Sequence, residues 1–218
     1  MYNTVIIVNQ SLRFSITTAE VPMNANKAAI LQAASDIFLK GGAEALSVRA
    51  IASKAGVSTM GIYSHFEGKQ GILEALYIEG FTVVDQAMSV LDGDLSPREA
   101  VLAAANNYFD LAQDNPAHYR LVFGQGDAGY APSAAAREAG EKAFGKLLAL
   151  ARRALPPAAS EAQQQMAALR IWSLMHGAVS LQQHAVAESV DMGLFRQNVL
   201  DSVLILIDGI AAEVEQQG

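Results

Sequence analysis

The sequence predicts an all-α fold, with a small three-helix unit on its N-terminal side and a larger helical bundle after it. Three observations lead to this prediction. Apolar residues recur every three or four positions in each long segment after Met23, and helix-capping residues stand where these segments begin. The content of hydrophobic residues is 51%, with a mean hydropathy of +0.20, which suffices for a sizeable core. No segment after Met23 requires a strand, and 218 residues fit a small domain attached to a larger one.

Residues 1–22 do not follow this pattern, and we expect a flexible arm or extension there. They lack the basic stretch and long apolar run of a secretory signal or membrane anchor. The apolar run VIIV at residues 5–8 and the alternating Phe14 and Ile16 could pair as strands, but no sheet is predicted nearby for them to join. An arm that enters the DNA minor groove needs basic residues, and Arg13 alone is available.

Residues 23–70 form the predicted helix-turn-helix domain. Asn24 or Asn26 caps a first helix, whose apolar stripe ends at Gly41 and Gly42. Ser47 then caps a helix of about two turns that stops at Gly56, because glycine accepts the left-handed backbone of a helix end. A second cap, Ser58, opens another short helix, so the pair reads as a helix-turn-helix.

The second short helix offers a polar face to a partner. Ile62 and Phe66 are spaced i, i+4 and can face the core, which leaves Thr59, Met60, Tyr63 and Ser64 outside. Hydroxyls and one flexible apolar side chain suit the DNA major groove, where they meet base edges, phosphates or a thymine methyl. On periodicity alone, a helical hairpin with no DNA role is the alternative.

The run AGVSTMGIYSHFEGKQGIL, with its Ala-Gly-Val-Ser turn, Tyr63, His65-Phe66 and Lys69, resembles the signature of TetR-type transcriptional regulators. This resemblance implies backbone contacts from Ser47, Tyr63, His65 and Lys69, and base contacts near Thr59, Met60 and Gly61. The sequence departs from the family at Met60, often Gly, and at Gly68, often Ser or Asp, so the base preference and the next helix cap are expected to differ. The candidate DNA-binding residues are Ser47, Arg49, Ser58, Thr59, Met60, Gly61, Tyr63, Ser64, His65 and Lys69.

The charge of the chain is polarised. Its formal net charge is −7. Residues 23–70 carry five basic and three acidic side chains, a net charge of +2, and residues 1–22 are neutral overall, so residues 71–218 carry −9. Only the N-terminal unit is therefore expected to approach phosphate, with a modest, salt-dependent nonspecific affinity.

Residues 71–218 form the predicted effector-binding and dimerisation domain. An amphipathic helix from Lys69 to Gly93 is expected to connect it to the helix-turn-helix. Capping residues Ser96-Pro97 and Asn115-Pro116 open two further helices. The remaining predicted boundaries are helices ending near Gln113 and Gly124, a loop over Gln125–Pro132, and helices over Ser133–Ala154, Ser160–Ala187 and Asp191–Gln216.

The last helix indicates a homodimer. Its run VLILI is apolar all round, whereas a terminal helix of a monomer keeps a wet face. One side is expected to pack on the chain's own core and the other on a partner, with the helix from Ser160 completing a four-helix interface across a two-fold axis. The alternative is a helix central to its own bundle. The candidate interface residues are Leu200, Val203, Leu204, Ile207 and Ile210.

Aromatic and polarisable side chains gather on three helices of the body. The run IWSLMHGAVSL resembles a TetR subgroup recognised by Trp, His and Gly, here Trp172, His176 and Gly177, and implies an apolar effector pocket with few polar groups. The same residues could simply fill the core. The candidate ligand-binding residues are Tyr108, Phe109, Tyr119, Phe123, Trp172, Met175 and His176.

The sequence thus predicts a cytoplasmic, homodimeric transcriptional regulator, with double-stranded DNA and a small-molecule effector as partners. A repressor released from a palindromic operator is the favoured form, and an architectural DNA-binding protein without effector control is the alternative. No cofactor or metal is expected, because cysteine is absent and the four histidines are scattered. No nucleophile-base pair or phosphate loop points to an enzyme, and no membrane partner is expected.

Overall fold

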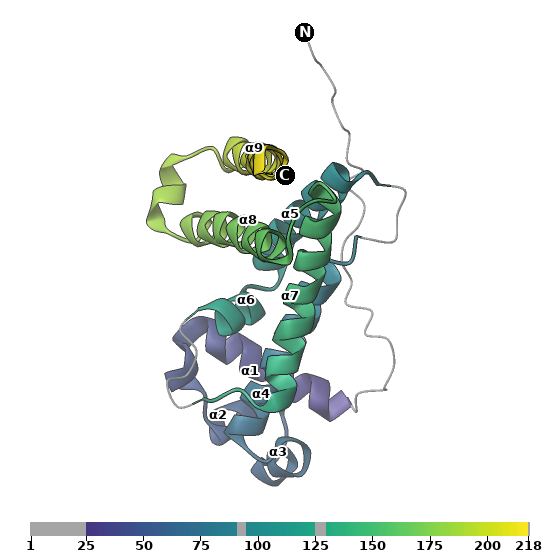
Figure 1. Cartoon of the computed structure of the whole chain (residues 1–218). Helices are drawn as coiled ribbons and strands as arrows, with labels where there is room; N and C mark the ends of the chain where they lie inside the picture. Colours follow the sequence, from purple (N-terminus) through teal and green to yellow (C-terminus); the bar gives the residue numbers. More distant parts are fainter. Residues whose placement is uncertain (1–24, 91–94, 125–129, 218) are drawn as a thin grey trace.

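In the computed structural model, which describes residues 25–90, 95–124 and 130–217, every regular element is a helix (Figure 1). The all-α prediction is confirmed for these residues, whereas the predictions for residues 1–22 and for most of the loop after Gly124 lie outside them. The elements are α1 (Ala25–Gly41), η1 (Ala43–Ala45), α2 (Val48–Ala55), α3 (Thr59–Phe66), α4 (Lys69–Ala87), α5 (Pro97–Asp114), α6 (Pro116–Phe123), α7 (Ala134–Ala154), α8 (Glu161–Gln182), η2 (Ala185–Ser189) and α9 (Met192–Gln217).

Two helices end earlier than predicted. Helix α4 stops at Ala87 rather than near Gly93. Just after its end, the hydroxyl of Ser89 donates to the carbonyl of Asp85 at 2.7 Å and takes the place of the backbone amide that would bond there in a continuing helix. Helix α8 stops at Gln182 rather than Ala187. There the amide of His184 bonds to the carbonyl of Leu181, so the chain tightens to three-residue spacing and continues as η2.

The helices enclose two hydrophobic cores. The first lies among α1, α2, α3, the start of α4 and α6, and is built around Ile30, Ile51, Ile62 and Leu73. The second lies among the end of α4 and helices α5 to α9, and includes Phe109. In Figure 1, α2 and α3 lie at one end of the molecule and α8 and α9 at the opposite end. The helix-turn-helix and the C-terminal helices are thus kept apart.

Helices α4 and α6 belong to both cores. Helix α4 contributes Ile72, Leu73 and Leu76 to the first core and Val83, Val84 and Ala87 to the second. On α6, Ala117 and Leu121 face the first core, and Tyr119 faces the second. Helix α6 therefore connects the two cores together with α4, for which the sequence predicts this role. Packing is continuous across residue 70, where the sequence places a domain boundary.

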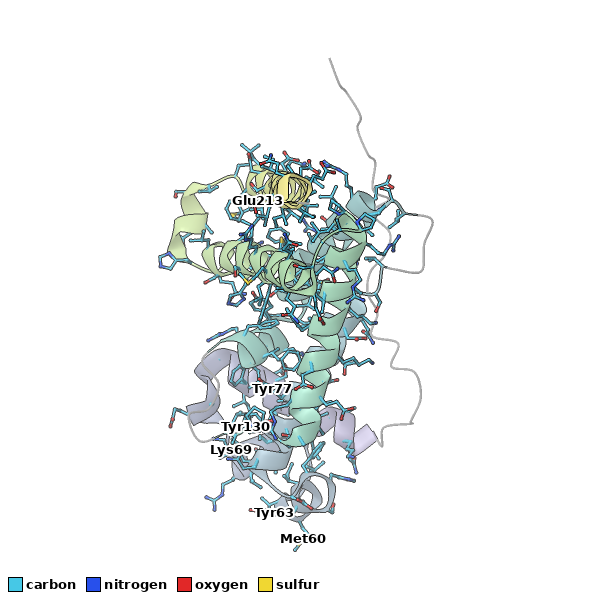
Figure 2. The ribbon with its side chains drawn as sticks, in the orientation of Figure 1. Met60, Tyr63, Lys69, Tyr77, Tyr130 and Glu213 are labelled. Carbon is cyan, nitrogen blue, oxygen red and sulfur yellow. The ribbon has the colours of Figure 1, made fainter. Side chains whose placement is uncertain are left out.

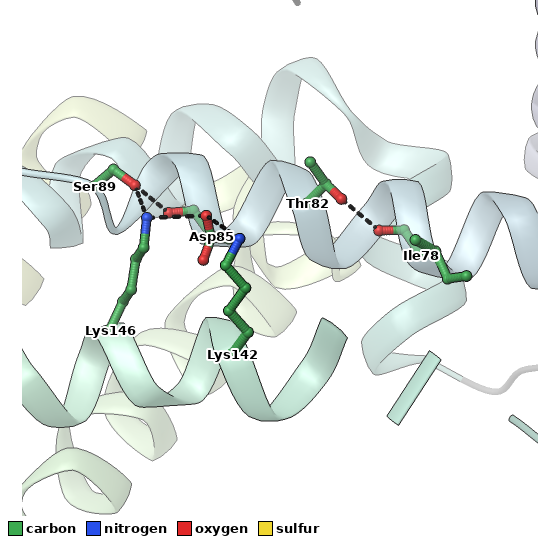
Figure 3. Close-up of polar contacts among 6 residues, drawn as sticks. All are labelled: Ile78, Thr82, Asp85, Ser89, Lys142 and Lys146. Atoms are coloured by element: carbon green, nitrogen blue, oxygen red, sulfur yellow. Dashed lines mark hydrogen bonds and ion pairs between the residues drawn. The ribbon is translucent and has the colours of Figure 1, made fainter. Parts of the chain in front are cut away.

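A polar contact fixes α4 to α7 (Figure 3). The carboxylate of Asp85, buried on α4, lies 2.9 Å from the ammonium of Lys146 and 3.8 Å from that of Lys142, both on α7. The ammonium of Lys146 also bonds to the hydroxyl of Ser89. The second carboxylate oxygen, Oδ1, is buried without a hydrogen-bond partner among the described residues. Buried charges need their partners, so this contact holds α4 and α7 in one register.

Gly71 sets how closely α3 approaches α4. A Cβ atom at this position would lie 1.6 Å from the carbonyl oxygen of Phe66, the last residue of α3. Because this neighbour is backbone, relief requires the two helices to separate. By contrast, a Cβ atom at Gly145, on the exposed side of α7, would meet nothing within 4 Å.

The two glycines give a matched test. We expect Gly71→Ala to lower the free energy of unfolding by about 3 kcal/mol through overpacking. Gly145→Ala should raise it by up to ~1 kcal/mol, because alanine is the better helix former. Urea denaturation followed by circular dichroism measures both. Equal midpoints for the two variants would contradict the close approach of α3 to α4.

Candidate nucleic-acid interface and ligand cavity

Two serine caps and one glycine shape the helix-turn-helix. The hydroxyl of Ser47 accepts from the amide of Ala50 at 3.1 Å, and that of Ser58 accepts from the amide of Gly61 at 3.0 Å. Between them, Gly56 has φ 69° and ψ 27°, the left-handed conformation predicted for the helix end. All three residues perform the local roles that their types predict.

The outer face of α3 is exposed as predicted. Ile62 and Phe66 are buried, whereas Met60 is 75% and Tyr63 56% exposed. Figure 2 shows Met60 and Tyr63 at the tip of the molecule, opposite Glu213 of α9. Thr59 and Ser64 are also exposed, and Ser64 donates its hydroxyl to the carbonyl of Gly61 at 2.9 Å. The free end of α3 thus combines a thioether, a phenol and two hydroxyls.

Gly68 supports the ring of Tyr63. Its φ of 98° and ψ of −159° lie in a region that essentially only glycine adopts, and it provides no side-chain cap for α4. A Cβ atom here would lie 3.2 Å from Cε1 of Tyr63. Helix α4 therefore begins without a side-chain cap, as expected from glycine at this position. The missing side chain also leaves room for the Tyr63 ring.

The candidate phosphate contacts surround this face unequally. Arg49 is exposed on α2, and His65 is half-buried. Lys69 is half-buried, with its ammonium donating to the carbonyl of Ala43 at 3.0 Å, so it fastens the start of α4 to η1. Lys69 therefore has a structural contact that the sequence did not predict.

An apolar cavity of about 70 Å³ lies among α4, α5, α6, α7 and α8. Four of the predicted ligand residues line it: Tyr108, Phe123, Trp172 and Met175. The other lining residues are Phe81, Val84, Met88, Val101, Ala104, Ala105, Gly140, Ala143, Phe144, Leu147, Leu150 and Ile171. The prediction thus located the cavity but included only part of its wall.

Three predicted ligand residues do not line the cavity. Phe109 is buried elsewhere in the core, with the guanidinium of Arg196 5.3 Å from its ring centroid. Tyr119 and His176 lie one layer behind the wall. The phenol of Tyr119 is 2.7 Å from Nδ1 of His176 and 3.4 Å from the phenol of Tyr108. Burial raises the pKa of Tyr119 to about 12 and the pKa of Tyr108 further above its usual range.

The lining residues that the sequence missed come mainly from α4, α5 and α7. The ring of Phe81 packs against Gly140, where a Cβ atom would lie 3.2 Å from its Cζ. This glycine in the middle of an otherwise strong helix pattern is the signal that marks a close approach. Phe144 and Phe123 both line the cavity, and both rings contact Trp172, with centroids 6.2 and 5.8 Å away, respectively.

The predicted dimer residues divide between the inside and the surface. Val203, Ile207 and Ile210 are buried in the chain's own core, which corrects their assignment to an outer face. Leu200 and Leu204 are half-buried. The outward residue of the VLILI run is Ile205, 72% exposed. Other exposed apolar residues are Met166, Leu169 and Leu181 on α8, and Leu194 on α9.

Two features of the described residues bear on other functions. None of their helices combines the length and apolar character needed to cross a bilayer. Their His, Asp and Glu side chains form no group of three suited to a metal ion.

Comparisons with known proteins match both parts of the chain. A family model of bacterial regulatory proteins of the tetR family matches residues 30–76, and a tetracyclin repressor-like C-terminal domain model matches residues 101–197. "Uncharacterized HTH-type transcriptional regulator YobS" of Bacillus subtilis is 30% identical over 93 residues, 43% of this chain and 49% of that protein. "HTH-type transcriptional activator FasR" of Mycolicibacterium smegmatis is 30% identical over 104 residues, 47% of this chain and 48% of that protein. The chain thus spans about half the length of these relatives.

A solved structure described as a bacterial regulatory protein in the tetR family, from Rhodococcus RHA1, has the same fold. Its TM-score is 0.66 at 20% identity, covering 86% of this chain and 97% of that one. The two family models match the capped helix-turn-helix and the helical body that shared helices join to it. The chain belongs to the TetR family. The Trp-His-Gly subgroup stays a prediction.

The buried phenols give a pH-dependent test. Between pH 10 and about 12 the folded protein keeps the Tyr119 proton that the unfolded chain, with an ordinary pKa of about 10, releases. Stability should therefore fall as pH rises through this range. We expect the urea midpoint of the wild type to fall more between pH 9 and pH 11 than that of Tyr119→Phe. Parallel declines would contradict the shifted pKa.

Proposed function

We propose that this chain is a homodimeric, sequence-specific DNA-binding repressor that an effector in the apolar cavity releases from a palindromic operator. The observation that carries the proposal is the exposed face of α3, with Thr59, Met60 and Tyr63 at the tip of a capped helix-turn-helix. This tip is on the part of the chain with net positive charge, so phosphate attracts it and repels the acidic body.

Different residues of the face suit different parts of DNA. Thr59 and Met60, at the N-terminal end of α3, are placed to meet base edges when that end enters a major groove. Tyr63, one turn further along, and exposed Arg49 on α2 are placed for phosphate. Ser47 and Ser58 already accept backbone amides as caps, but each hydroxyl keeps its proton to donate to a phosphate oxygen.

The outer face of α8 and α9 is the proposed dimer surface. It carries exposed Met166 and Leu169 on α8 and Leu194 and Ile205 on α9, at the end of the molecule away from α3. Arg170 and Glu213 join the two helices at 3.4 Å and can border this surface. A two-fold axis here would present two α3 helices to half-sites about 34–36 Å apart, one DNA turn.

Effector control follows from the helices that both cores share. Phe81, Val84 and Met88 of α4 line the cavity, and the same helix carries Ile72 and Leu73 in the core beneath α3. A ligand that prefers one tilt of α4 therefore also prefers one spacing of the two α3 helices in the dimer. An architectural DNA-binding protein needs no cavity, and the 70 Å³ space favours the effector-controlled form.

The DNA proposal is tested by separating residues that contact phosphate from residues that contact base edges. Tyr63→Ala should weaken binding to operator and random DNA alike, by about tenfold, because phosphate contacts carry no sequence information. Thr59→Ala should instead change the base preferred at one position, with about 1–3 kcal/mol of discrimination at stake. Selection of bound duplexes from a random pool, followed by gel-shift titration at physiological salt, measures both. Tyr63→Phe is the matched control that keeps the ring.

Full affinity of Tyr63→Ala for every duplex would remove α3 from the interface. A loss confined to the selected operator would mean that Tyr63 reads bases, which would reverse the orientation proposed for the helix.

The dimer surface has a matched pair within one turn of α9. Ile205→Glu places a charge on an exposed position, so the protein should stay folded and become monomeric in sedimentation. Ile207→Glu places the charge in the core, where the residue is 2% exposed, and should lower stability by several kcal/mol. A wild-type protein that sediments as a monomer at micromolar concentration, or an Ile205→Glu protein that stays dimeric, would contradict this surface.

A further inference from the structure

We propose that the cavity selects an uncharged, mainly hydrocarbon molecule with one hydrogen-bond donor, and that the phenol oxygen of Tyr108 accepts from this donor. The inference rests on the proposed effector role of the cavity and specifies the chemistry of its ligand.

The wall of the cavity carries no formal charge among its described residues. Its side chains are aliphatic and aromatic apart from the Tyr108 hydroxyl, the Trp172 indole nitrogen and the thioethers of Met88 and Met175. Lys142 and Lys146 are on α7 near this wall, but their ammonium groups pair with Asp85 and do not line it. A ligand in the cavity would therefore find no counter-ion.

The absence of a counter-ion sets the charge of the ligand. Moving an unpaired carboxylate or ammonium from water into an apolar site costs so much that the group neutralises instead. A carboxylic acid would thus enter in its protonated form only. Its apparent affinity should fall tenfold for each pH unit above its pKa, whereas an alcohol of the same length should bind equally at every pH.

The hydrogen bonds behind the wall use the proton of the Tyr108 hydroxyl and leave its oxygen to accept. Its phenol lies 3.4 Å from that of Tyr119, which lies 2.7 Å from Nδ1 of His176. Tyr108 is the donor in its bond to Tyr119, so its proton is used there and its oxygen is left to accept. A phenol oxygen can accept up to two hydrogen bonds, and this capacity of Tyr108 suits a donor such as a hydroxyl.

The volume sets the size of the ligand. At about 10–15 Å³ for each water-sized group, 70 Å³ holds roughly five to seven such groups. A chain of about eight carbons with its hydroxyl has nine such groups, roughly two to four more than this space holds, so it enters only if the wall moves outward, whereas a single ring needs less movement. The ring of Phe81 and the flexible side chain of Met88 are the parts of α4 that such a ligand would displace.

Three probes of equal length test the proposal: 1-octanol, its isostere 1-methoxyheptane, and octanoate. Trp172 is the only tryptophan and lines the cavity, so its fluorescence reports binding in the full-length protein. At pH 8 we expect 1-octanol to bind about three- to tenfold more tightly than the ether, which cannot donate a hydrogen bond. Octanoate should bind at least tenfold more weakly than 1-octanol and improve as the pH falls.

Two variants separate the roles of donor and charge. Tyr108→Phe keeps the ring and should bring the ratio of alcohol to ether affinity to about one. Leu147→Lys supplies a cation from a half-buried wall position and should strengthen octanoate at least tenfold relative to 1-octanol. Circular dichroism and urea denaturation confirm that each variant is folded.

The proposal is overturned if octanoate binds wild-type protein within tenfold of 1-octanol at pH 8, or if the alcohol has no advantage over the ether. Failure of all three probes to bind up to their solubility limits would overturn it as well. The effector role has its own readout, because operator DNA should weaken 1-octanol binding. Binding of 1-octanol that operator leaves unchanged would remove effector control but keep the ligand class.

Discussion

The continuity of packing through α4 is the constraint on which the rest of the structure depends. One face of this helix completes the core beneath the helix-turn-helix, and its C-terminal half forms part of the cavity wall. Helices transmit displacement because their backbone bonds keep them stiff, and packed cores change between discrete arrangements rather than deforming gradually. No separate linker is therefore needed between the proposed DNA-binding face of α3 and the proposed ligand cavity.

Helix α6 gives this connection a second point of support. It has eight residues, yet it places Tyr119 behind the cavity wall and Ala117 and Leu121 in the N-terminal core. His118 on the same helix lies 3.3 Å from Glu79 of α4. A displacement of either helix is thus shared with the other. The contact between Asp85 and Lys146 limits this displacement on the α7 side.

The local chemistry of the helices was predictable from the sequence, and their mutual arrangement was less so. Ser47, Gly56 and Ser58 act within a few residues, and their caps follow from residue type alone. The VLILI run was misleading because periodicity cannot orient a helix that is apolar all round. Asp201 and Asp208, on the exposed side of α9, mark the outward face and place Ile205 there. The α7 side of the cavity depends on contacts between distant segments, for which Gly140 was the sole local signal.

The glycine beneath Tyr63 makes two positions in the sequence inseparable. Residue 68 must adopt a backbone conformation that side chains oppose, and it must leave the phenol ring its place. Suppose that α3 is replaced by the same helix of a relative that has Ser or Asp at this position. The grafted helix would then pack against a glycine, whereas its own sequence is matched to a residue with a side chain. Exchange of DNA specificity between such proteins therefore requires a segment that extends past the end of the helix to residue 68, even though this glycine has no side chain with which to read DNA.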